Sequence, residues 1–142
     1  MIYFDTSYLV RLYYDDPGAD RVRALAATDH VVCAALGQAE MMAAFHRKLR
    51  ERAIKHAAYA ALTEQVEAHI DRGAFQWIAT DDAILSRVRQ VCRNLPGSVF
   101  LRGADALHLA TAAESGFPIV YSNDAHMLAA AEHFGIKGIN VI

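Results

Sequence analysis

Ile2-Tyr3-Phe4-Asp5-Thr6-Ser7, near the start of the chain, joins three apolar residues to an acid and two hydroxyl side chains. A short apolar run is typical of a strand buried on both faces of a parallel sheet. The residues from Ser7 to Tyr14 predict a helix, which ends at the turn-forming Asp15-Asp16-Pro17-Gly18. The stretch therefore predicts a strand that leads directly into a helix, with Asp5 at the carboxyl end of the strand.

The same alternation of short apolar runs and longer helical segments continues along the chain. It predicts an α/β fold with a short-stranded parallel central sheet flanked by helices. The predicted strands are Ile2–Phe4, His30–Cys33, Phe75–Ile78, Ile119–Tyr121 and Ile139–Val141. After the first helix, further helices are predicted to end near Ala27 and to span Leu36–Arg52, Lys55–Arg72, Asp82–Cys92, Ala104–Ser115 and Ala125–Phe134.

Size and composition predict a single domain, residues 1–142, with no segment long enough to span a bilayer. The 14 Lys and Arg residues against 16 Asp and Glu give a net charge of −2, so a nucleic-acid partner must be held by a local basic patch.

Asp5 interrupts any signal-peptide run, and we expect a cytoplasmic location. Cys33 and Cys92 have no CxxC spacing and fit a reducing compartment, although their pairing stays open.

Four acids lie where the predicted fold can bring them to one end of the sheet. Asp5 and Asp124 follow predicted strands, Glu40 lies about two helical turns beyond the second strand, and Asp105 begins a helix. Ligands of open α/β sheets bind beyond the carboxyl ends of the strands. Converging carboxylates repel one another by roughly a few kcal/mol per pair, so we expect a hard divalent cation such as Mg²⁺ or Mn²⁺ among them. The pattern indicates metal-assisted phosphate chemistry.

Each acid also has a simpler interpretation. Asp5 and Asp124 precede predicted helices and could serve as N-caps. Asp105 has local ionic partners in sequence, whereas Glu40 has only small or apolar neighbours three and four residues away. Site and cap stay open for the two aspartates, and Glu40 is the hardest of the four to explain without a cationic ligand.

Two hydroxyl side chains, Thr6 and Ser122, stand close in sequence to Asp5 and Asp124. Hydroxyls beside metal-bound carboxylates orient them, and such partners influence metal affinity. Ordinary turn and cap chemistry explains the same two residues equally well.

The densest positive charge lies in the segment Arg47–Lys55. Arg47 shares a helical face with Glu40, and Arg50 continues near that face. This run predicts a track for nucleic-acid phosphates or, alternatively, a solvated helix end whose cations favour the C-terminus. The candidates for phosphate binding are Arg11, Arg47, Lys48, Arg50 and Arg102. The two outside the basic run lie closer in sequence to the acids.

Other catalytic motifs are absent from the sequence. There is no HExxH motif or paired Cys/His spacing for zinc, no GxxxxGK[ST] loop and no GxSxG elbow. His108 and His126 lie near site acids, but a lone histidine is more often structural.

With these residues in place, the chain resembles a PIN-domain ribonuclease, and in size and motif order the VapC-type toxin of a VapBC toxin–antitoxin pair. The resemblance covers nearly the whole chain and rests on Phe4-Asp5-Thr6-Ser7, Ala39-Glu40, Asp105-Ala106-Leu107-His108-Leu109-Ala110-Thr111-Ala112 and Ser122-Asn123-Asp124. The third of these segments is the most specific. His126 stands where family members often carry a further acid.

The resemblance implies a three-layer PIN-like fold and Mg²⁺- or Mn²⁺-dependent cleavage of RNA. It assigns Asp5, Glu40, Asp105 and Asp124 to the family's acidic quartet, and Thr6 and Ser122 to its usual hydroxyl positions. It further implies cytoplasmic action, a homodimer and a cognate antitoxin as partner.

Two alternatives belong to other classes of protein. A receiver-type phosphoacceptor domain also gathers acids and Mg²⁺ at strand ends, but it normally has paired acids after the first strand and a lysine after the last. A PIN-like module that binds RNA or metal without turnover is compatible with every motif above, and a metal-dependent cleavage assay separates it from the nuclease.

Overall fold

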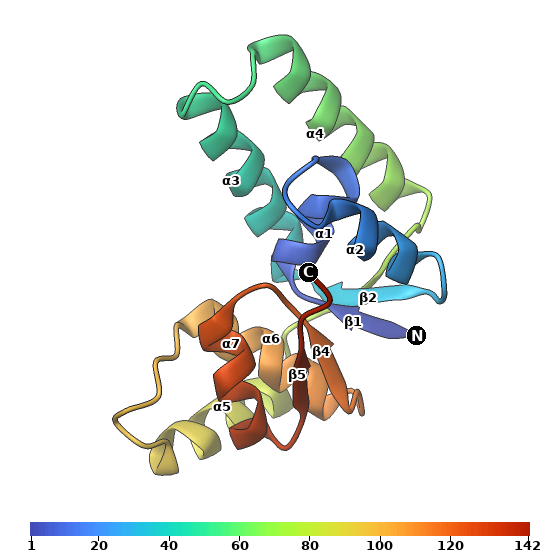
Figure 1. Cartoon of the computed structure of the whole chain (residues 1–142). Helices are drawn as coiled ribbons and strands as arrows, with labels where there is room; N and C mark the ends of the chain where they lie inside the picture. Colours follow the sequence, from blue (N-terminus) through green and yellow to red (C-terminus); the bar gives the residue numbers. More distant parts are fainter.

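The computed structural model describes residues 1–142 as one parallel five-stranded sheet with helices on both faces (Figure 1). The strands are β1 (Ile2–Phe4), β2 (Val31–Ala34), β3 (Gln76–Ile78), β4 (Ile119–Tyr121) and β5 (Lys137–Ile139). The helices are α1 (Thr6–Tyr13), α2 (Ala19–Ala26), α3 (Leu36–Arg50), α4 (His56–Asp71), α5 (Asp82–Asn94), α6 (Gly103–Glu114), α7 (Ala125–Ala130) and the 3₁₀ helix η1 (Ala131–Phe134). The predicted fold class is confirmed.

The strand order is β3-β2-β1-β4-β5, with every neighbouring pair parallel. The chain runs outward from β1 to β3 on one side and from β4 to β5 on the other, so the order reverses between β1 and β4. Open α/β sheets bind ligands at such a switch point. Receiver domains have the order 2-1-3-4-5 instead, so the receiver-type alternative is wrong.

The sheet separates two apolar layers because successive strand residues face opposite sides. Tyr3 packs in a core cluster with residues of α5, α6 and α7, whereas Phe4 packs in a second cluster with residues of α1 to α4. Figure 1 shows the same division, with α3 and α4 extending away from the sheet as a hairpin. The three-layer architecture follows from this alternation.

The last strand and the last helix differ from their predicted bounds. The strand predicted at Ile139–Val141 lies two residues earlier, because Gly135 in the left-handed region ends η1 and the chain pairs with β4 at once. Gly138 allows this packing: a Cβ there would lie 2.9 Å from Leu128 Cα on α7. The predicted helix Ala125–Phe134 is α-helical only to Ala130. None of the helices combines the length and apolar character that a membrane span requires.

Candidate functional site

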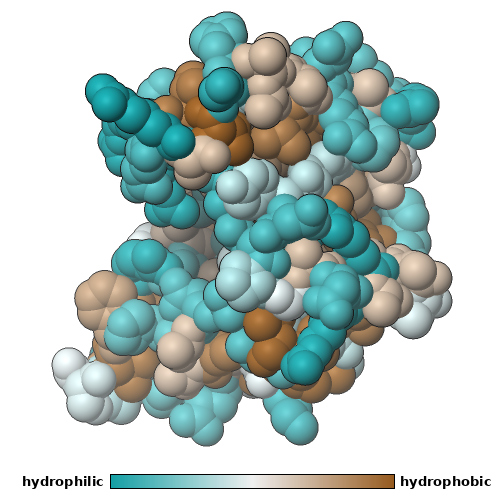
Figure 2. All heavy atoms as spheres, turned by 45° about the horizontal axis from the view of Figure 1, so that its top comes forward, coloured by the Kyte–Doolittle hydropathy of each residue, from teal (hydrophilic) through white to brown (hydrophobic).

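A cavity of about 380 Å³ opens where the sheet order reverses, and all four predicted acids line it. Asp5 follows β1, Asp124 follows β4, Glu40 comes from α3 and Asp105 from the first turn of α6. In Figure 2 the molecule is notched on its left side, with hydrophilic residues on the rim of the notch. The fold therefore brings together side chains that are up to 119 positions apart in the sequence, since Asp5 and Asp124 line the same cavity.

Asp5 is buried at the junction of β1 and α1 and uses both carboxylate oxygens. Oδ1 accepts hydrogen bonds from Ser7 Oγ at 2.7 Å and from the Tyr8 amide at 3.1 Å, which caps α1. Oδ2 accepts from Ser122 Oγ at 2.6 Å. Burial raises the pKa of Asp5 above its ordinary value, and the hydrogen bonds from Ser122 and Ser7 offset only part of this rise. Asp5 is thus both a helix cap and a cavity-lining acid.

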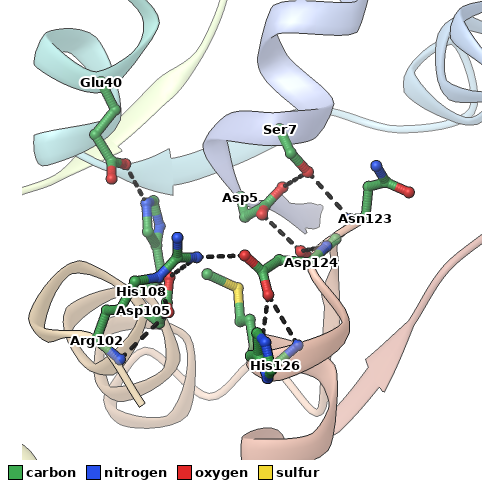
Figure 3. Close-up of polar contacts among 11 residues, drawn as sticks. Asp5, Ser7, Glu40, Arg102, Asp105, His108, Asn123, Asp124 and His126 are labelled. Atoms are coloured by element: carbon green, nitrogen blue, oxygen red, sulfur yellow. Dashed lines mark hydrogen bonds and ion pairs between the residues drawn. The ribbon is translucent and has the colours of Figure 1, made fainter. Parts of the chain in front are cut away.

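The two serines that hold Asp5 also tie β1 to the segment after β4. Ser7 Oγ accepts from the Asn123 amide at 3.0 Å, and Ser122 Oγ accepts from the Asp124 amide at 2.9 Å. Each hydroxyl therefore donates to Asp5 and accepts from the neighbouring segment, as Figure 3 shows for Ser7. These contacts fix Asp5 relative to Asp124 across the switch point.

Glu40 is held by two donors from other elements. Thr6 Oγ1 donates to Glu40 Oε2 at 2.5 Å, and His108 Nε2 lies 2.7 Å from the same oxygen. Burial alone would raise the pKa of Glu40, but the hydrogen bonds from His108 and Thr6 outweigh it and hold the pKa below its ordinary value. Glu40 has no basic neighbour three or four residues away in its own helix, and its hydrogen-bond partners come from α1 and α6 instead.

A buried tyrosine lies behind His108. The Tyr3 hydroxyl accepts from the Ala34 amide at 3.1 Å and lies 3.2 Å from His108 Nδ1. An ionised carboxylate only accepts, so His108 Nε2 carries the hydrogen that it shares with Glu40. The contacts therefore connect the Ala34 amide, Tyr3, His108 and Glu40 in one series.

The other two acids share one arginine. Arg102 Nε donates to Asp105 Oδ2 at 2.8 Å and Nη2 donates to Asp105 Oδ1 at 3.1 Å, while Nη2 also contacts Asp124 Oδ2 (Figure 3). Asp124 caps α7 as well, accepting from the His126 and Met127 amides. Burial raises the pKa of Asp124, but those amides and Arg102 outweigh it and lower the pKa overall.

The donor set fits a hard divalent cation in its chemistry, since four carboxylates on one cavity are the ligand type that Mg²⁺ and Mn²⁺ prefer. In this conformation no three His, Cys, Asp or Glu side chains come close enough to hold one ion. A guanidinium lies instead between Asp105 and Asp124. The donor chemistry therefore fits a divalent cation, and Arg102 occupies the place between two of the four acids.

The predicted phosphate-binding residues differ in whether their charged groups already bind other residues of the protein. Arg11 is buried and donates to the Pro17 and Ser7 carbonyls. Lys48 forms an ion pair with Asp16 at 2.9 Å and lies 3.8 Å from the centre of the Tyr14 ring. The exposed pair on α3 forms no ion pair: Arg47 lines the acidic cavity, and Arg50 lines an adjoining hollow on α3. The sequence predicted one group of phosphate-binding cations. In the fold Arg47 and Arg50 form no ion pair, whereas Arg11 and Lys48 are engaged by other residues.

Sequence reasoning missed Ser7 and Tyr3 and left His108 without a role. Ser7 stands in the same motif as Asp5, and its spacing of two residues from an N-cap acid is a usable signal. Tyr3 and His108 carry no local signal because their contacts join β1, β2, α3 and α6. These residues complete the polar lining behind the carboxylates.

Comparisons with known proteins agree with this geometry. The family model described as PIN domain matches residues 2–133. No curated protein sequence matches the chain.

Three solved structures resemble the fold at 18% sequence identity each. The crystal structure of FitAcB from Neisseria gonorrhoeae superposes with a TM-score of 0.76 and covers 99% of this chain and 97% of its own. FitAB bound to an IR36 DNA fragment gives 0.73, covering 99% and 94%. Mycobacterium tuberculosis VapC20, described as a toxin that cleaves the sarcin-ricin loop, gives 0.68, covering 92% and 95%.

Proposed function

The chain belongs to the PIN-domain family, and on that premise we propose that it is a metal-dependent endoribonuclease that hydrolyses RNA phosphodiester bonds. The observation that carries the proposal is the cavity at the switch point, which combines four carboxylates with cationic side chains. Carboxylates suit a divalent cation, and the cations around them suit the phosphates of a bound strand. No covalent nucleophile is required for this chemistry.

In the proposed mechanism Asp5, Glu40, Asp105 and Asp124 would hold Mg²⁺ or Mn²⁺. The bound metal would supply polarisation of the phosphoryl oxygen and a water of lowered pKa. Ser7 and Ser122 each hold one of the two Asp5 carboxylate oxygens, and Thr6 and His108 both contact Oε2 of Glu40. The protein thus contributes carboxylates that are already oriented before substrate arrives.

The basic residues near the cavity are proposed to contact the RNA backbone. Arg47 and Arg50 are exposed on α3 and free to bind phosphate. Arg102 lies at the cavity rim, and its guanidinium, which contacts Asp105 and Asp124 in this structure, would suit a phosphate bidentately after leaving them. Arg11 and Lys48 are already engaged by the fold and contribute mainly positive potential.

We further propose that the chain is the toxin of a type II toxin–antitoxin pair, acting in the cytoplasm as a homodimer with a cognate antitoxin as partner. Support comes from the likeness to FitAcB, to FitAB on DNA and to the VapC20 toxin over nearly their whole lengths. Co-purification with the product of a neighbouring gene, followed by measurement of the complex's mass, tests the partnership.

The activity is tested on total cellular RNA with Mg²⁺, Mn²⁺ or EDTA, followed by mapping of the fragment ends. Hydrolysis by a metal-activated water leaves a 5′-phosphate and a 3′-hydroxyl, whereas attack by the ribose 2′-hydroxyl leaves a cyclic phosphate. Cleavage that persists in EDTA or yields cyclic-phosphate ends overturns the mechanism. Loss of cleavage in Asp5→Asn and Asp124→Asn, with the fold intact, supports it. If RNA binds but is never cut, the binding module without turnover is the correct alternative.

A further inference from the structure

Arg102 already provides a positive charge between two of the proposed metal-binding acids. It is the N-cap residue of α6, and its guanidinium contacts Asp105 with two nitrogens and Asp124 with one (Figure 3). Its side chain is 55% exposed, whereas that of Asp105 is only 6% exposed. An exposed arginine therefore reaches inward over a buried carboxylate at the rim of the cavity.

Local helix capping explains only half of this arrangement. The pair with Asp105 is an i,i+3 contact in the first turn of α6, where Asp105 Oδ2 also accepts from the Arg102 backbone amide at 3.4 Å, as an acid at this position of a helix start commonly does. The contact with Asp124 joins residues 22 positions apart and adds nothing to that cap. Because opposite charges attract, the contact of the Arg102 guanidinium with a second carboxylate indicates that Asp105 and Asp124 together carry negative charge without another cationic partner.

We propose that Arg102 is a built-in competitor for the divalent cation: it binds Asp105 and Asp124 in the metal-free protein and releases both when the metal binds. The inference rests on the proposed function in one respect, namely that these acids are metal ligands. It goes further by assigning to Arg102 the place of a cation between two of the acids.

The geometry allows the exchange to take place without refolding. Arg102 has a long flexible side chain at the start of a helix, and more than half of it already faces solvent. Arginine keeps its charge at all accessible pH values, so it can leave the carboxylates only by rotating away. Asp5 and Glu40 contact no arginine or lysine, since their partners are hydroxyl, backbone amide and imidazole donors.

Metal affinity measured without RNA tests the proposal. We expect Arg102→Ala and Arg102→Gln to bind Mn²⁺ about tenfold more tightly than the wild type, because each removes charge-assisted hydrogen bonds that the metal must replace. Arg102→Lys keeps the charge but not the guanidinium fork, so its Mn²⁺ affinity should lie between that of the wild type and that of these two variants. Arg93→Ala is the matched control, since Arg93 is an exposed arginine in the last turn of α5 and outside the cavity. Calorimetry or the electron paramagnetic resonance signal of free Mn²⁺ gives the dissociation constants.

A second measurement needs no variant. In wild-type protein labelled with ¹⁵N, the Arg102 Nε–H resonance should shift and lose its protection from solvent exchange during a titration with Mg²⁺. Variants with metal affinity equal to or weaker than the wild type, or an Nε–H resonance unchanged at saturating Mg²⁺, overturn the proposal, as does a complete lack of metal binding in both wild type and Arg102→Ala.

The two proposals fail in different ways. Tighter Mn²⁺ binding by Arg102→Ala in a protein that never cuts RNA supports the competitor and refutes the nuclease. Metal-dependent cleavage combined with equal Mn²⁺ affinities supports the nuclease and refutes the competitor.

Discussion

The four acids of the cavity form two pairs, which differ in the kind of donor that holds their negative charge. Asp5 and Glu40 form the neutral-donor half, whose donors carry no permanent charge: serine and threonine hydroxyls, a backbone amide and an imidazole. Asp105 and Asp124 are held by the cationic Arg102. Neutral donors orient a carboxylate and leave its charge available, whereas a guanidinium orients it and cancels part of the charge.

This difference separates a permanent part of the site from a changeable one. The neutral-donor half is buried in contacts that join β1, β2, α3 and α6, so it cannot move without disturbing the core. In the arginine half, Asp124 also caps α7, but the connection between Asp105 and Asp124 depends on one exposed side chain, that of Arg102. We expect mutations in the first half to affect orientation and chemistry, and mutations of Arg102 to affect mainly how tightly a cation binds.

The largest effect is expected from Glu40→Gln, which removes one charge from the neutral-donor half. Lewis-acid stabilisation by a bound metal is worth several kcal/mol, so the loss of a ligand charge should slow RNA cleavage about 10³-fold. Single-turnover cleavage at saturating Mn²⁺ measures this rate. Glu64→Gln, an exposed acid on α4 with no ion pair, should cleave at the wild-type rate. A loss smaller than tenfold in Glu40→Gln, with the fold intact by circular dichroism, contradicts the role of Glu40.

The sequence predicted the elements and the four acids because both carry local patterns. Strand β1 and the cap at Asp5 are encoded within six residues, and the predicted strands agree with the observed ones to within one residue except for the displaced β5. Both interpretations left open for Asp5 and Asp124 hold at the level of geometry, since each caps a helix and lines the cavity.

The contacts that distinguish the two halves could not be predicted, because they depend on tertiary packing. His108 and Glu40 are 68 residues apart, and Arg102 and Asp124 are 22 apart on different elements. In sequence, Arg102 appeared as a phosphate ligand and His108 as a structural histidine. Only the strand order shows that α6 brings both residues to the same cavity.

The next effect concerns the hydrogen-bond chain behind Glu40. Tyr3→Phe removes the hydroxyl that lies 3.2 Å from His108 Nδ1 and accepts from the Ala34 amide. Loss of such outer partners typically costs about 10–100-fold in activity or metal affinity, and we expect a cleavage rate in that range. Tyr13→Phe is a matched control, because the Tyr13 hydroxyl also bonds a histidine, His69, but lies outside the cavity.

A spectroscopic readout separates positioning from simple destabilisation in Tyr3→Phe. The ¹⁵N shifts of the His108 ring should indicate a single tautomer protonated at Nε2 in the wild type and a mixture in the variant. A single tautomer in both proteins means that Tyr3 does not orient His108, whatever the effect on the cleavage rate.

Smaller effects, of opposite sign on the melting temperature, are expected when Asp5 or Asp124 is replaced by asparagine. Burial raises the pKa of Asp5 above 3.8, so ionised Asp5 costs stability, and that cost grows as pH rises through the shifted pKa. The amides of α7 and Arg102 overcome burial and lower the pKa of Asp124 below 3.8, so its charge stabilises the fold at neutral pH. In EDTA at pH 7, Asp5→Asn should therefore melt above the wild type and Asp124→Asn below it.

The pH dependence gives the control for this pair. Asparagine is also a good N-cap, so the caps themselves are retained in both variants. The difference for Asp5→Asn should vanish as pH falls below about 3.8, and that for Asp124→Asn should vanish only at lower pH, where the native carboxyl gains its proton. Melting shifts of the same sign at pH 7 contradict the contrast between the two halves.

The smallest effect concerns the cations beside the cavity, where the same contrast between free and engaged charges recurs. Arg47 is exposed and forms no ion pair, whereas Lys48 is bound to Asp16 and lies over the Tyr14 ring. Each lost phosphate contact flattens the salt dependence of RNA binding by about one unit of slope. With inactive Asp5→Asn as the parent protein, Arg47→Ala should reduce the slope by about that amount, and Lys48→Ala should change it much less. Equal slopes for all three proteins mean that α3 does not follow the RNA backbone, and a larger change for Lys48→Ala means that the ion pair with Asp16 opens when RNA binds.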